Sequence, residues 1–484
     1  MSFSSNRQQP SAGRAVGSGL LLALYVFEAS AVVAMLALNR YYNLLDTLTV
    51  RQLAMVAAPL VFALVTGGYV VVNLLRAFLS DPRSVMFAIA LNLIAVLLIC
   101  AGSEVVVRAF AVSQLTGTWF GSTLLLPRDW EDVKARHREI LALVRDDLSY
   151  FVVDDRLGWA PGRARRSKEG LYSTSIEGFR SASSGFSYAS RPPGPRVAIV
   201  GDSFTFGLEV PFESTWGAVL EQALGADATV LNLGVDGYGV DQALLRYERD
   251  ARSWKPTVAI LGFIEHDLLR TTSVYSFVTF PEWGFPFSKP HFVVQDGTLK
   301  LLTERLQSPS QILAMESIAD LPYITDDPGY DAEEWEQHFY DASYAVRFVR
   351  SRFRRWAVPK AETHRSIAQL NRELVLRFVR VAEADGAVPL VVFFPARTDL
   401  DGEARPDRDA MLTALQDAGV KYVDLRACIG SVGIEQAFIP EHYHYSAVGN
   451  AAVARCLLPY VRDGIAHAPN SAQLLLTGNS AGRR

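Results

Sequence analysis

Three long apolar stretches near the start of the chain constrain its fold more than any other feature. They lie at about residues 16–38, 53–75 and 85–105. Each is long enough to cross a membrane as a helix, because about 20 residues at a rise of roughly 1.5 Å span a hydrocarbon core of about 30 Å. A cleavable signal peptide would have one shorter apolar segment. The sequence therefore predicts three retained transmembrane helices.

Arginines around these stretches predict the orientation in the membrane. Arg7 and Arg14 precede the first stretch, and Arg76 and Arg83 lie in the short loop between the second and the third. Cytoplasmic loops carry an excess of positive charge, so this side is expected to be cytoplasmic, although the intervening loop also holds arginines. Everything after Arg108 then lies outside the cytoplasm. We predict a multi-pass cell-membrane protein with its soluble part in the periplasm or outside the cell.

Composition argues against several classes of function. The 484 residues include 47 Lys and Arg interspersed with 51 Asp and Glu, for a net charge of -4. Without a basic face or run, no nucleic-acid partner is expected. The cysteines have no metal-ligand spacing, so we expect neither a metal site nor a cofactor. Cys428 and Cys456, in the soluble part, are equally compatible with a disulfide and with two buried thiols.

The order of patterns along the chain predicts four regions. Residues 1–108 form the membrane domain, and residues 109–195 form a connector and an extended lead-in that ends in a Pro-rich breaker. Residues 196–465 are expected to form the main soluble domain, and residues 466–484 a disordered tail. The connector contains charged and apolar residues at helical spacing, which predicts an amphipathic helix near the membrane.

Short apolar runs alternate with helical patterns in the main soluble domain. The runs lie at residues 197–200, 229–233, 258–262, 390–394 and 422–425. Continuous apolar strands with helices between them predict an α/β fold with a parallel sheet covered on both faces. The ligand site of such a sheet lies at the carboxyl ends of its strands. The aromatic-rich segment at about 271–360 interrupts this rhythm. We interpret it as an inserted cap over the site; structural packing and membrane-surface contact remain alternatives.

A serine and a histidine follow the first and last of these strands. Gly201 permits a tight exit from the strand, so Ser203 would begin the next helix, where backbone N–H groups can stabilise an oxyanion. A serine hydroxyl needs a base at neutral pH, and His444 is the candidate. Glu441, three residues earlier, is predicted to orient this imidazole and stabilise its charged form, with His442 as the alternative.

Four short motifs occur in order along the soluble part. They are Gly201-Asp202-Ser203, Asn232-Leu-Gly-Val-Asp-Gly237, Gly262-Phe-Ile-Glu-His-Asp267 and Glu441-x-x-His444. Together they resemble the SGNH (GDSL-like esterase and lipase) hydrolase superfamily. Asp155-Arg-Leu-Gly-Trp159 and Glu177-Gly-Phe-Arg180 also resemble the lead-in of its membrane-tethered bacterial members, so the resemblance covers about residues 154–461. The resemblance implies a flavodoxin-like three-layer α/β/α fold. It also implies an oxyanion hole from the backbone N–H groups of Ser203 and Gly237 and an Asn side chain, with Asp202 and Asp267 in support.

The sequence departs from the family pattern at two positions. His266 stands where the Asn of the oxyanion hole is expected, and Glu441 stands where the family usually has Asp. A neutral imidazole still donates one N–H, so His266 is predicted to complete the hole in a tautomer-dependent way. Loss of such a donor costs about 2.7–4 kcal/mol, so slower catalysis is an expected consequence. Glu in place of Asp is tolerated in other Ser-His-acid enzymes.

These observations leave three functions open. The first is a membrane-anchored serine esterase that removes O-acyl groups, most simply acetyl, from an extracytoplasmic glycan or lipid through an acyl-enzyme. The second is an O-acyltransferase acting on a cell-surface polysaccharide; water access to the acyl-enzyme decides between the two. Three spans are too few to resemble known acyl-donor membrane domains, so transfer would require a membrane-protein partner. The third is a non-catalytic glycan-binding module, which His266 keeps open.

Overall fold

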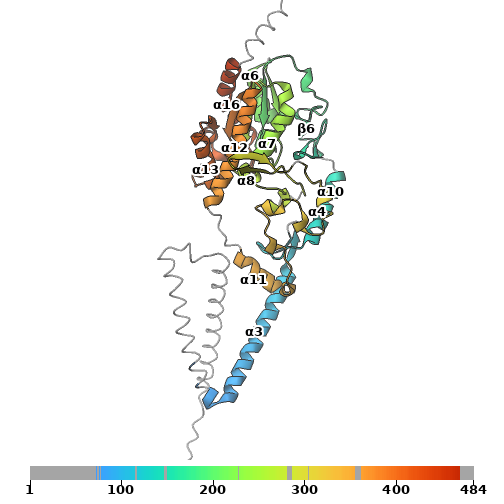
Figure 1. Ribbon diagram of the computed structural model, residues 1–484, viewed down its shortest axis with the longest axis vertical. Coiled ribbons are helices and arrows are strands. Elements are labelled where there is room, and N and C mark those ends of the chain that lie inside the picture. The colour runs from blue at the N-terminus through green and yellow to red at the C-terminus, as the bar shows by residue number, and fades with distance from the viewer. Residues whose placement is uncertain are drawn as a thin grey trace, which may run out of the picture. The chain divides into compact units, whose positions relative to one another are not determined.

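The computed structural model resolves two compact units (Figure 1). It describes residue 72, residue 76 and residues 78–468, except for 115–116, 147–149, 227, 281–285, 304 and 355–360. The first unit comprises Met1–Pro127 with Gln337–Val358, and the second comprises Arg128–Glu336 with Pro359–Arg484. The segment predicted as one cap is therefore shared between the two units. The predicted spans at 16–38 and 53–75 lie outside the described residues, apart from residue 72.

The first unit contains the long apolar helix α3 (Pro82–Phe110), which includes the third predicted span. Asp81 caps its start by accepting a hydrogen bond from the Ser84 N–H, and Pro82 occupies the first turn, where no N–H is needed. Among the described residues, α3 is the one helix long and apolar enough to cross a membrane, by length and composition only. This is weak support for a membrane anchor.

The described part of the first unit also contains a short sheet and a second α-helix. The antiparallel strands are β1 (Val112–Gln114), β2 (Gly117–Phe120) and β3 (Thr123–Leu124). The carboxylate of Glu104 in α3 accepts hydrogen bonds from the Ser343 hydroxyl at 2.8 Å and the Ala345 N–H at 2.9 Å. These bonds satisfy free donors at the start of α11 (Tyr344–Arg354) and so join the two helices.

The second unit is built on a five-stranded parallel sheet. Its strands are β8 (Arg196–Val200), β9 (Thr229–Asn232), β10 (Val258–Phe263), β13 (Val388–Phe393) and β14 (Tyr422–Asp424). The spatial order β14-β13-β10-β8-β9 is that of flavodoxin-like folds. The predicted α/β fold with a parallel sheet is therefore confirmed. The chain reverses its direction of winding between β8 and β10, which opens a crevice at their carboxyl ends.

Helices cover both faces of this sheet. Successive side chains of a strand point to opposite faces, so each strand contributes to two apolar clusters. Val197 and Ile199 of β8 belong to one apolar cluster, whereas Ala198 and Val200 belong to the other. The first face carries α6 (Trp216–Leu224), α14 (Arg426–Val432), α15 (Ile434–Ala437) and α16 (Ala447–His467). The second carries α7 (Val240–Arg246), α12 (Ala361–Ala384) and α13 (Pro406–Asp417). Two cores thus hold the sheet between helical layers.

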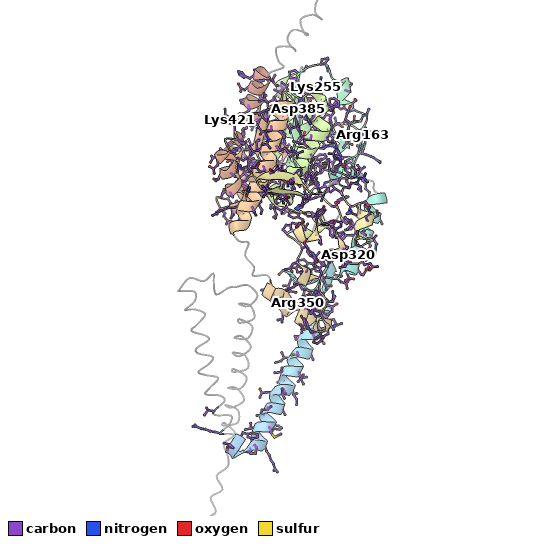
Figure 2. All side chains as sticks on the ribbon, in the orientation of Figure 1. Arg163, Lys255, Asp320, Arg350, Asp385 and Lys421 are labelled. Atoms are coloured by element: carbon purple, nitrogen blue, oxygen red, sulfur yellow. A yellow bond between two sulfur atoms is a disulfide. The ribbon has the colours of Figure 1, made fainter. Side chains whose placement is uncertain are left out.

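A smaller apolar cluster joins α4 (Trp130–Asp146), the predicted amphipathic connector, to the cap residues of this unit. Trp130 stacks on Phe277 with ring centroids 6.1 Å apart, and Ile312 is fully buried beside them. Arg163, Lys255 and Lys421 are exposed around the unit (Figure 2).

A disulfide links α14 to α16 on one face of the sheet. Cys428 and Cys456 are bonded, with their Cα atoms 6.5 Å apart. Of the two alternatives compatible with the sequence, the structure therefore shows the disulfide.

Candidate active site

The candidate nucleophile Ser203 lies in a sharp turn after β8. It begins the short helix α5 (Ser203–Phe206), which Asp202 caps by accepting a backbone N–H at 2.9 Å. Gly201 is needed before this turn because a Cβ there would lie 2.3 Å from the Thr205 Oγ1. The turn places Ser203 at the carboxyl edge of the sheet, beside the crevice between β8 and β10.

Ser203, His444 and Glu209 form a hydrogen-bonded chain. The Ser203 Oγ lies 2.8 Å from the His444 Nε2, and the His444 Nδ1 lies 3.0 Å from the Glu209 Oε2. A carboxylate only accepts, so Nδ1 carries the proton and Nε2 is free to accept the serine hydroxyl. The His444 side chain is 14% exposed and that of Glu209 is 27% exposed. This arrangement lets the imidazole remove the serine proton while a carboxylate stabilises the imidazolium.

Glu209 reaches the histidine from an unusual backbone conformation. Its φ of +68° is left-handed, which costs a non-glycine residue about 1–3 kcal/mol that surrounding contacts must offset. Its N–H donates to the Tyr172 hydroxyl at 2.9 Å. Its second carboxylate oxygen lies 2.8 Å from the His442 Nδ1. The carboxylate is thus held between two imidazoles, those of His442 and His444.

The structure places Glu209 at the His444 imidazole, and not Glu441, the residue predicted for this position. Glu441 is exposed, with a φ of +60°, in a turn closed by the Ile439 N–H, which donates to the His444 carbonyl at 3.0 Å. His444 therefore stands at the base of the turn, whereas Glu441 faces solvent. Glu209 lies 235 residues from His444 in sequence, so no local spacing connects them. In the sequence, only the closeness of Glu209 to Ser203 along the chain could have suggested that it lies at the site.

The loop that begins at Asn232, the second of the four motifs, is hydrogen-bonded to α5, the helix that begins at Ser203. The Asn232 side-chain amide donates to the Thr205 carbonyl at 3.0 Å, and its oxygen accepts the Gly234 N–H at 3.0 Å. A Cβ at Gly234 would lie 2.4 Å from a backbone nitrogen of α5, so only glycine fits. Gly237 has a φ of +77° and follows Asp236, which lines the same cavity as Ser203. Donation by the Gly237 N–H to an oxyanion remains a prediction.

His266 lines the same cavity from α8 (Glu265–Arg270), the helix after β10. Its ring stacks on that of Tyr443 with centroids 5.6 Å apart, and the Tyr443 hydroxyl lies 3.4 Å from its Nδ1. Burial lowers the pKa of His266, and the positive charge of Arg270 lowers it further. The neutral imidazole is therefore favoured, and it has one N–H to donate. The role of that N–H in an oxyanion hole also remains a prediction.

A buried ion-pair cluster supports the turn that holds Ser203 and α8. The Arg270 Nη1 lies 2.6 Å from the Asp267 Oδ1 and 3.5 Å from the Asp202 Oδ2. Burial raises the pKa of Asp202 and that of Asp267, whereas the positive charge of Arg270 opposes both shifts. Burial by itself would lower the pKa of Arg270, but Asp267, Asp202 and Asp236 raise it. Asp202 and Asp267 thus connect the serine turn to the helix that carries His266.

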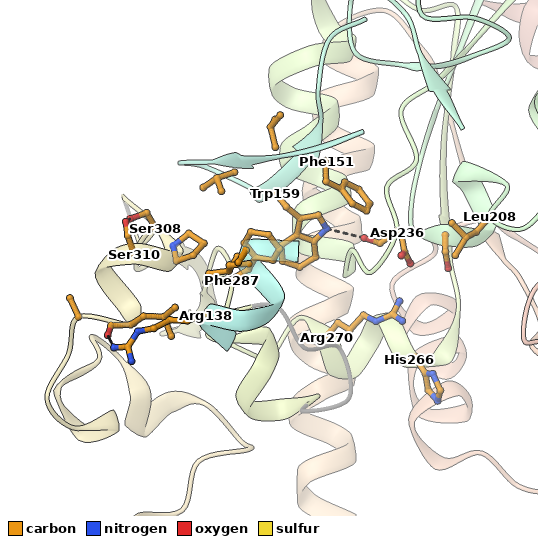
Figure 3. Close-up of a pocket in the computed structure, with 18 of the residues that line it drawn as sticks. Arg138, Phe151, Trp159, Leu208, Asp236, His266, Arg270, Phe287, Ser308 and Ser310 are labelled. Carbon is orange, nitrogen blue, oxygen red and sulfur yellow. Dashed lines mark hydrogen bonds between the residues drawn. The ribbon is translucent and has the colours of Figure 1, made fainter. Parts of the chain in front are cut away.

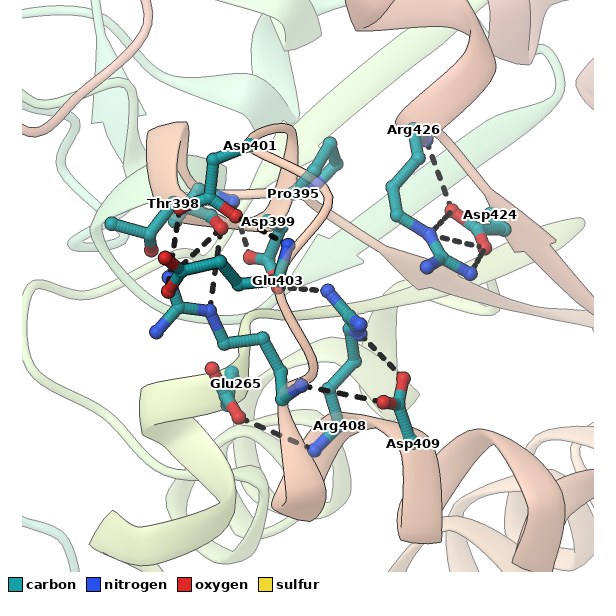
Figure 4. Close-up of polar contacts among 12 residues, drawn as sticks. Glu265, Pro395, Thr398, Asp399, Asp401, Glu403, Arg408, Asp409, Asp424 and Arg426 are labelled. Carbon is teal, nitrogen blue, oxygen red and sulfur yellow. Dashed lines mark hydrogen bonds and ion pairs between the residues drawn. The ribbon is translucent and has the colours of Figure 1, made fainter.

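A second charged network braces the start of α8 (Figure 4). Arg408 of α13 pairs with Asp399 at 2.9 Å and with Asp409 at 2.8 Å. Its backbone N–H donates to the Glu265 carboxylate at 3.4 Å. The loop after β13 and α13 therefore hold the residue next to the site histidine.

A cavity of about 1360 Å³ adjoins the candidate catalytic residues. Ser203, His266 and His444 all line it. Figure 3 shows Asp236, Arg270, His266 and Leu208 toward one end, Phe151, Trp159 and Phe287 in the middle, and Arg138, Ser308 and Ser310 at the other end. In the described part of the chain, no group of three or more His, Cys, Asp or Glu residues is arranged to hold a metal ion.

Comparison with known proteins adds structural likenesses only. No protein-family model and no curated protein matches the chain. A lipolytic G-D-S-L family member from Veillonella parvula DSM 2008 is 11% identical, with 55% of this chain and 97% of that one covered and a TM-score of 0.29. The acetyl xylan esterase AlAXEase is 12% identical, with coverages of 55% and 99% and a TM-score of 0.30. A carbohydrate acetylesterase family member from Sinorhizobium meliloti is 13% identical, with coverages of 56% and 99% and a TM-score of 0.28. Likeness at this level assigns neither a family nor an activity.

Proposed function

We propose that this chain is a serine esterase of the SGNH type that removes O-acyl groups from a glycan or a lipid. The observation that carries the proposal is the distance of 2.8 Å between the Ser203 Oγ and the His444 Nε2, with Glu209 at 3.0 Å behind the imidazole. The site sits in the crevice where ligands bind in flavodoxin-like sheets. A non-catalytic module would have no need of this alignment.

The proposed reaction proceeds through an acyl-enzyme. His444 takes the hydroxyl proton as the Ser203 Oγ attacks the ester carbonyl, and Glu209 stabilises the imidazolium. The N–H groups of Ser203, Gly237 and His266 are the proposed donors to the oxyanion. The intermediate collapses as His444 gives its proton to the departing alcohol. Water then attacks the acyl-serine by the same route and releases the carboxylic acid.

A second candidate is transfer of the acyl group to a sugar hydroxyl. The cavity of about 1360 Å³ beside Ser203 has room for an acceptor larger than water. The same intermediate would then pass its acyl group to a polysaccharide, and a membrane-protein partner would supply the donor. Appearance of an acylated glycan on addition of a sugar acceptor distinguishes transfer from hydrolysis.

The proposed location is the outer side of the cell membrane. Two observations support it. Helix α3 has the length and composition of a membrane span. The disulfide between Cys428 and Cys456 is of a kind that persists mainly in oxidising compartments such as the periplasm.

Hydrolysis of p-nitrophenyl esters by the full chain in detergent tests the proposed activity. We expect Ser203→Ala to abolish it and to prevent covalent labelling by a fluorophosphonate. The matched control is Ser190→Ala, because Ser190 is exposed and outside the cavity. Equal rates for wild type and Ser203→Ala would contradict catalysis by this serine.

A further inference from the structure

The cavity beside Ser203 is much larger than an acetyl group requires. Its volume of about 1360 Å³ exceeds the roughly 300–1,000 Å³ of ordinary small-molecule pockets. All of its lining residues belong to the second unit. An acetyl group would fill only a small part of this cavity.

The middle of this cavity has apolar aromatic walls. Phe151 and Trp159 come from the hairpin of β4 (Phe151–Asp154) and β5 (Gly158–Pro161), and Phe287 packs against Trp159 with centroids 5.4 Å apart. The indole N–H of Trp159 donates to the Asp236 carbonyl at 2.9 Å. That donor is satisfied within the protein, so Trp159 presents the apolar part of its ring to a ligand.

The part of the cavity farther from Ser203 continues between two helices. Leu141 and Ala142 of α4 line it together with Leu313, which follows α10 (Pro309–Ile312). Arg138 donates to the Leu313 carbonyl at 3.0 Å and so holds the two segments together. The cavity is therefore an apolar channel that ends near a hydrogen-bonded polar group.

The direction of the reaction indicates which part of an ester occupies this channel. The departing alcohol must receive a proton from the His444 Nε2, so it leaves on the imidazole side. There Tyr443 and His266 supply polar groups. In Figure 3, His266 lies at the opposite end of the cavity from Arg138, with Trp159 between them. The aromatic channel is thus the side left for the acyl chain.

We propose that the acyl group is a medium or long fatty acyl chain that lies in this channel, with its carbonyl at Ser203. This inference rests on the proposed esterase function and replaces acetyl, the simplest sequence-based expectation, with a lipid acyl ester. Burial of each methylene corresponds to about a fourfold gain in kcat/KM where the fit is complete. Six additional methylenes, only partly buried, should therefore give at least about a tenfold gain.

Two isomeric esters, ethyl decanoate and decyl acetate, test the inference with the full-length protein in detergent. Their composition is the same, so the difference in rate of acid release reports which side of the ester carries the long chain. We expect ethyl decanoate to be hydrolysed at least about tenfold faster. Faster hydrolysis of decyl acetate, or equal rates, would overturn the inference while leaving the esterase function intact. Absence of any Ser203-dependent hydrolysis would instead refute the proposed function.

A variant of a channel residue tests where the acyl chain of the substrate lies in the protein. Ala142→Trp places a large ring in the far part of the channel, and we expect the ratio of p-nitrophenyl octanoate to acetate hydrolysis to fall at least about tenfold. Ala135→Trp is the matched control, since Ala135 is an exposed residue of the same helix and does not line the cavity. An unchanged ratio in Ala142→Trp, or the same fall in the control, would place the acyl chain outside this channel and overturn the inference.

Discussion

Replacing Glu209 with Gln tests the feature of the site that only the structure shows. The carboxylate Oε2 lies 3.0 Å from the His444 Nδ1. Glu209→Gln keeps the size of the side chain and removes its charge. The amide NH2 group can also donate to Nδ1, which would move the imidazole proton to Nε2 and leave no acceptor for the serine hydroxyl. We expect slower acylation of Ser203 with the fold retained.

The size of the effect follows from the geometry of the ion pair. Two unit charges about 4 Å apart interact by about 4 kcal/mol at an effective dielectric constant near 20, and by about 1 kcal/mol in water. Glu209 is 27% exposed, so its environment is intermediate. About 2–3 kcal/mol of lost imidazolium stabilisation corresponds to a fall in kcat/KM of about 30- to 160-fold. The tautomer effect adds to this fall.

The assay is hydrolysis of a p-nitrophenyl ester, with Glu441→Gln as the matched comparison. Glu441 is exposed and also carries one carboxylate, so we expect that variant to stay within about threefold of wild type. Thermal denaturation verifies that both variants are folded. Near-wild-type activity of Glu209→Gln together with a large loss in Glu441→Gln would refute the assignment of the acid.

Two further variants test what holds the site and its domain together. Arg270→Met leaves buried carboxylates uncompensated, so the free energy of unfolding should fall by about 3–5 kcal/mol, measured with urea. Burial raises the pKa of Asp202 and that of Asp267. A carboxyl group whose pKa is raised by folding favours the folded state while it is protonated, and this contribution is lost as the pH rises through the folded pKa. The loss of folding free energy in Arg270→Met should therefore be larger in mildly alkaline than in mildly acidic buffer. Cys428→Ser with Cys456→Ser opens a loop of 28 residues and should cost about 3–4 kcal/mol in the same assay; unchanged unfolding curves would contradict either expectation.

The sheet was predictable because its strands are buried on both faces. A strand covered by helices on each side must be apolar at successive positions, which leaves a continuous run in the sequence. The run predicted at residues 197–200 corresponds to β8, and that at 258–262 corresponds to β10. The predicted cap at about residues 271–360 was less predictable. Residues 337–358 belong to the first unit, and no sequence periodicity marks the boundary at residue 337.

The candidate site was predictable only in part. Ser203 directly follows β8, so the strand pattern places it at the carboxyl edge of the sheet, whereas α14 and α15 separate His444 from β14. The contact of Glu209 with His444 was not predicted, because it depends on the left-handed backbone of Glu209 in one loop and on a turn that directs Glu441 to solvent. Glu209 has no fixed spacing from His444, and the hydrogen bond of its backbone to Tyr172 is visible only in three dimensions.

By itself, the sequence determined the parallel sheet and the apolar helix, since each depends on local patterns that burial imposes, and it indicated Ser203 and His444 as candidate residues. The tertiary structure decided which carboxylate meets His444, whether Cys428 and Cys456 bond, and how far the cavity extends from Ser203. These properties depend on distances between segments remote in the chain. Such distances arise from packing of the whole domain and leave no periodic trace in the residues themselves.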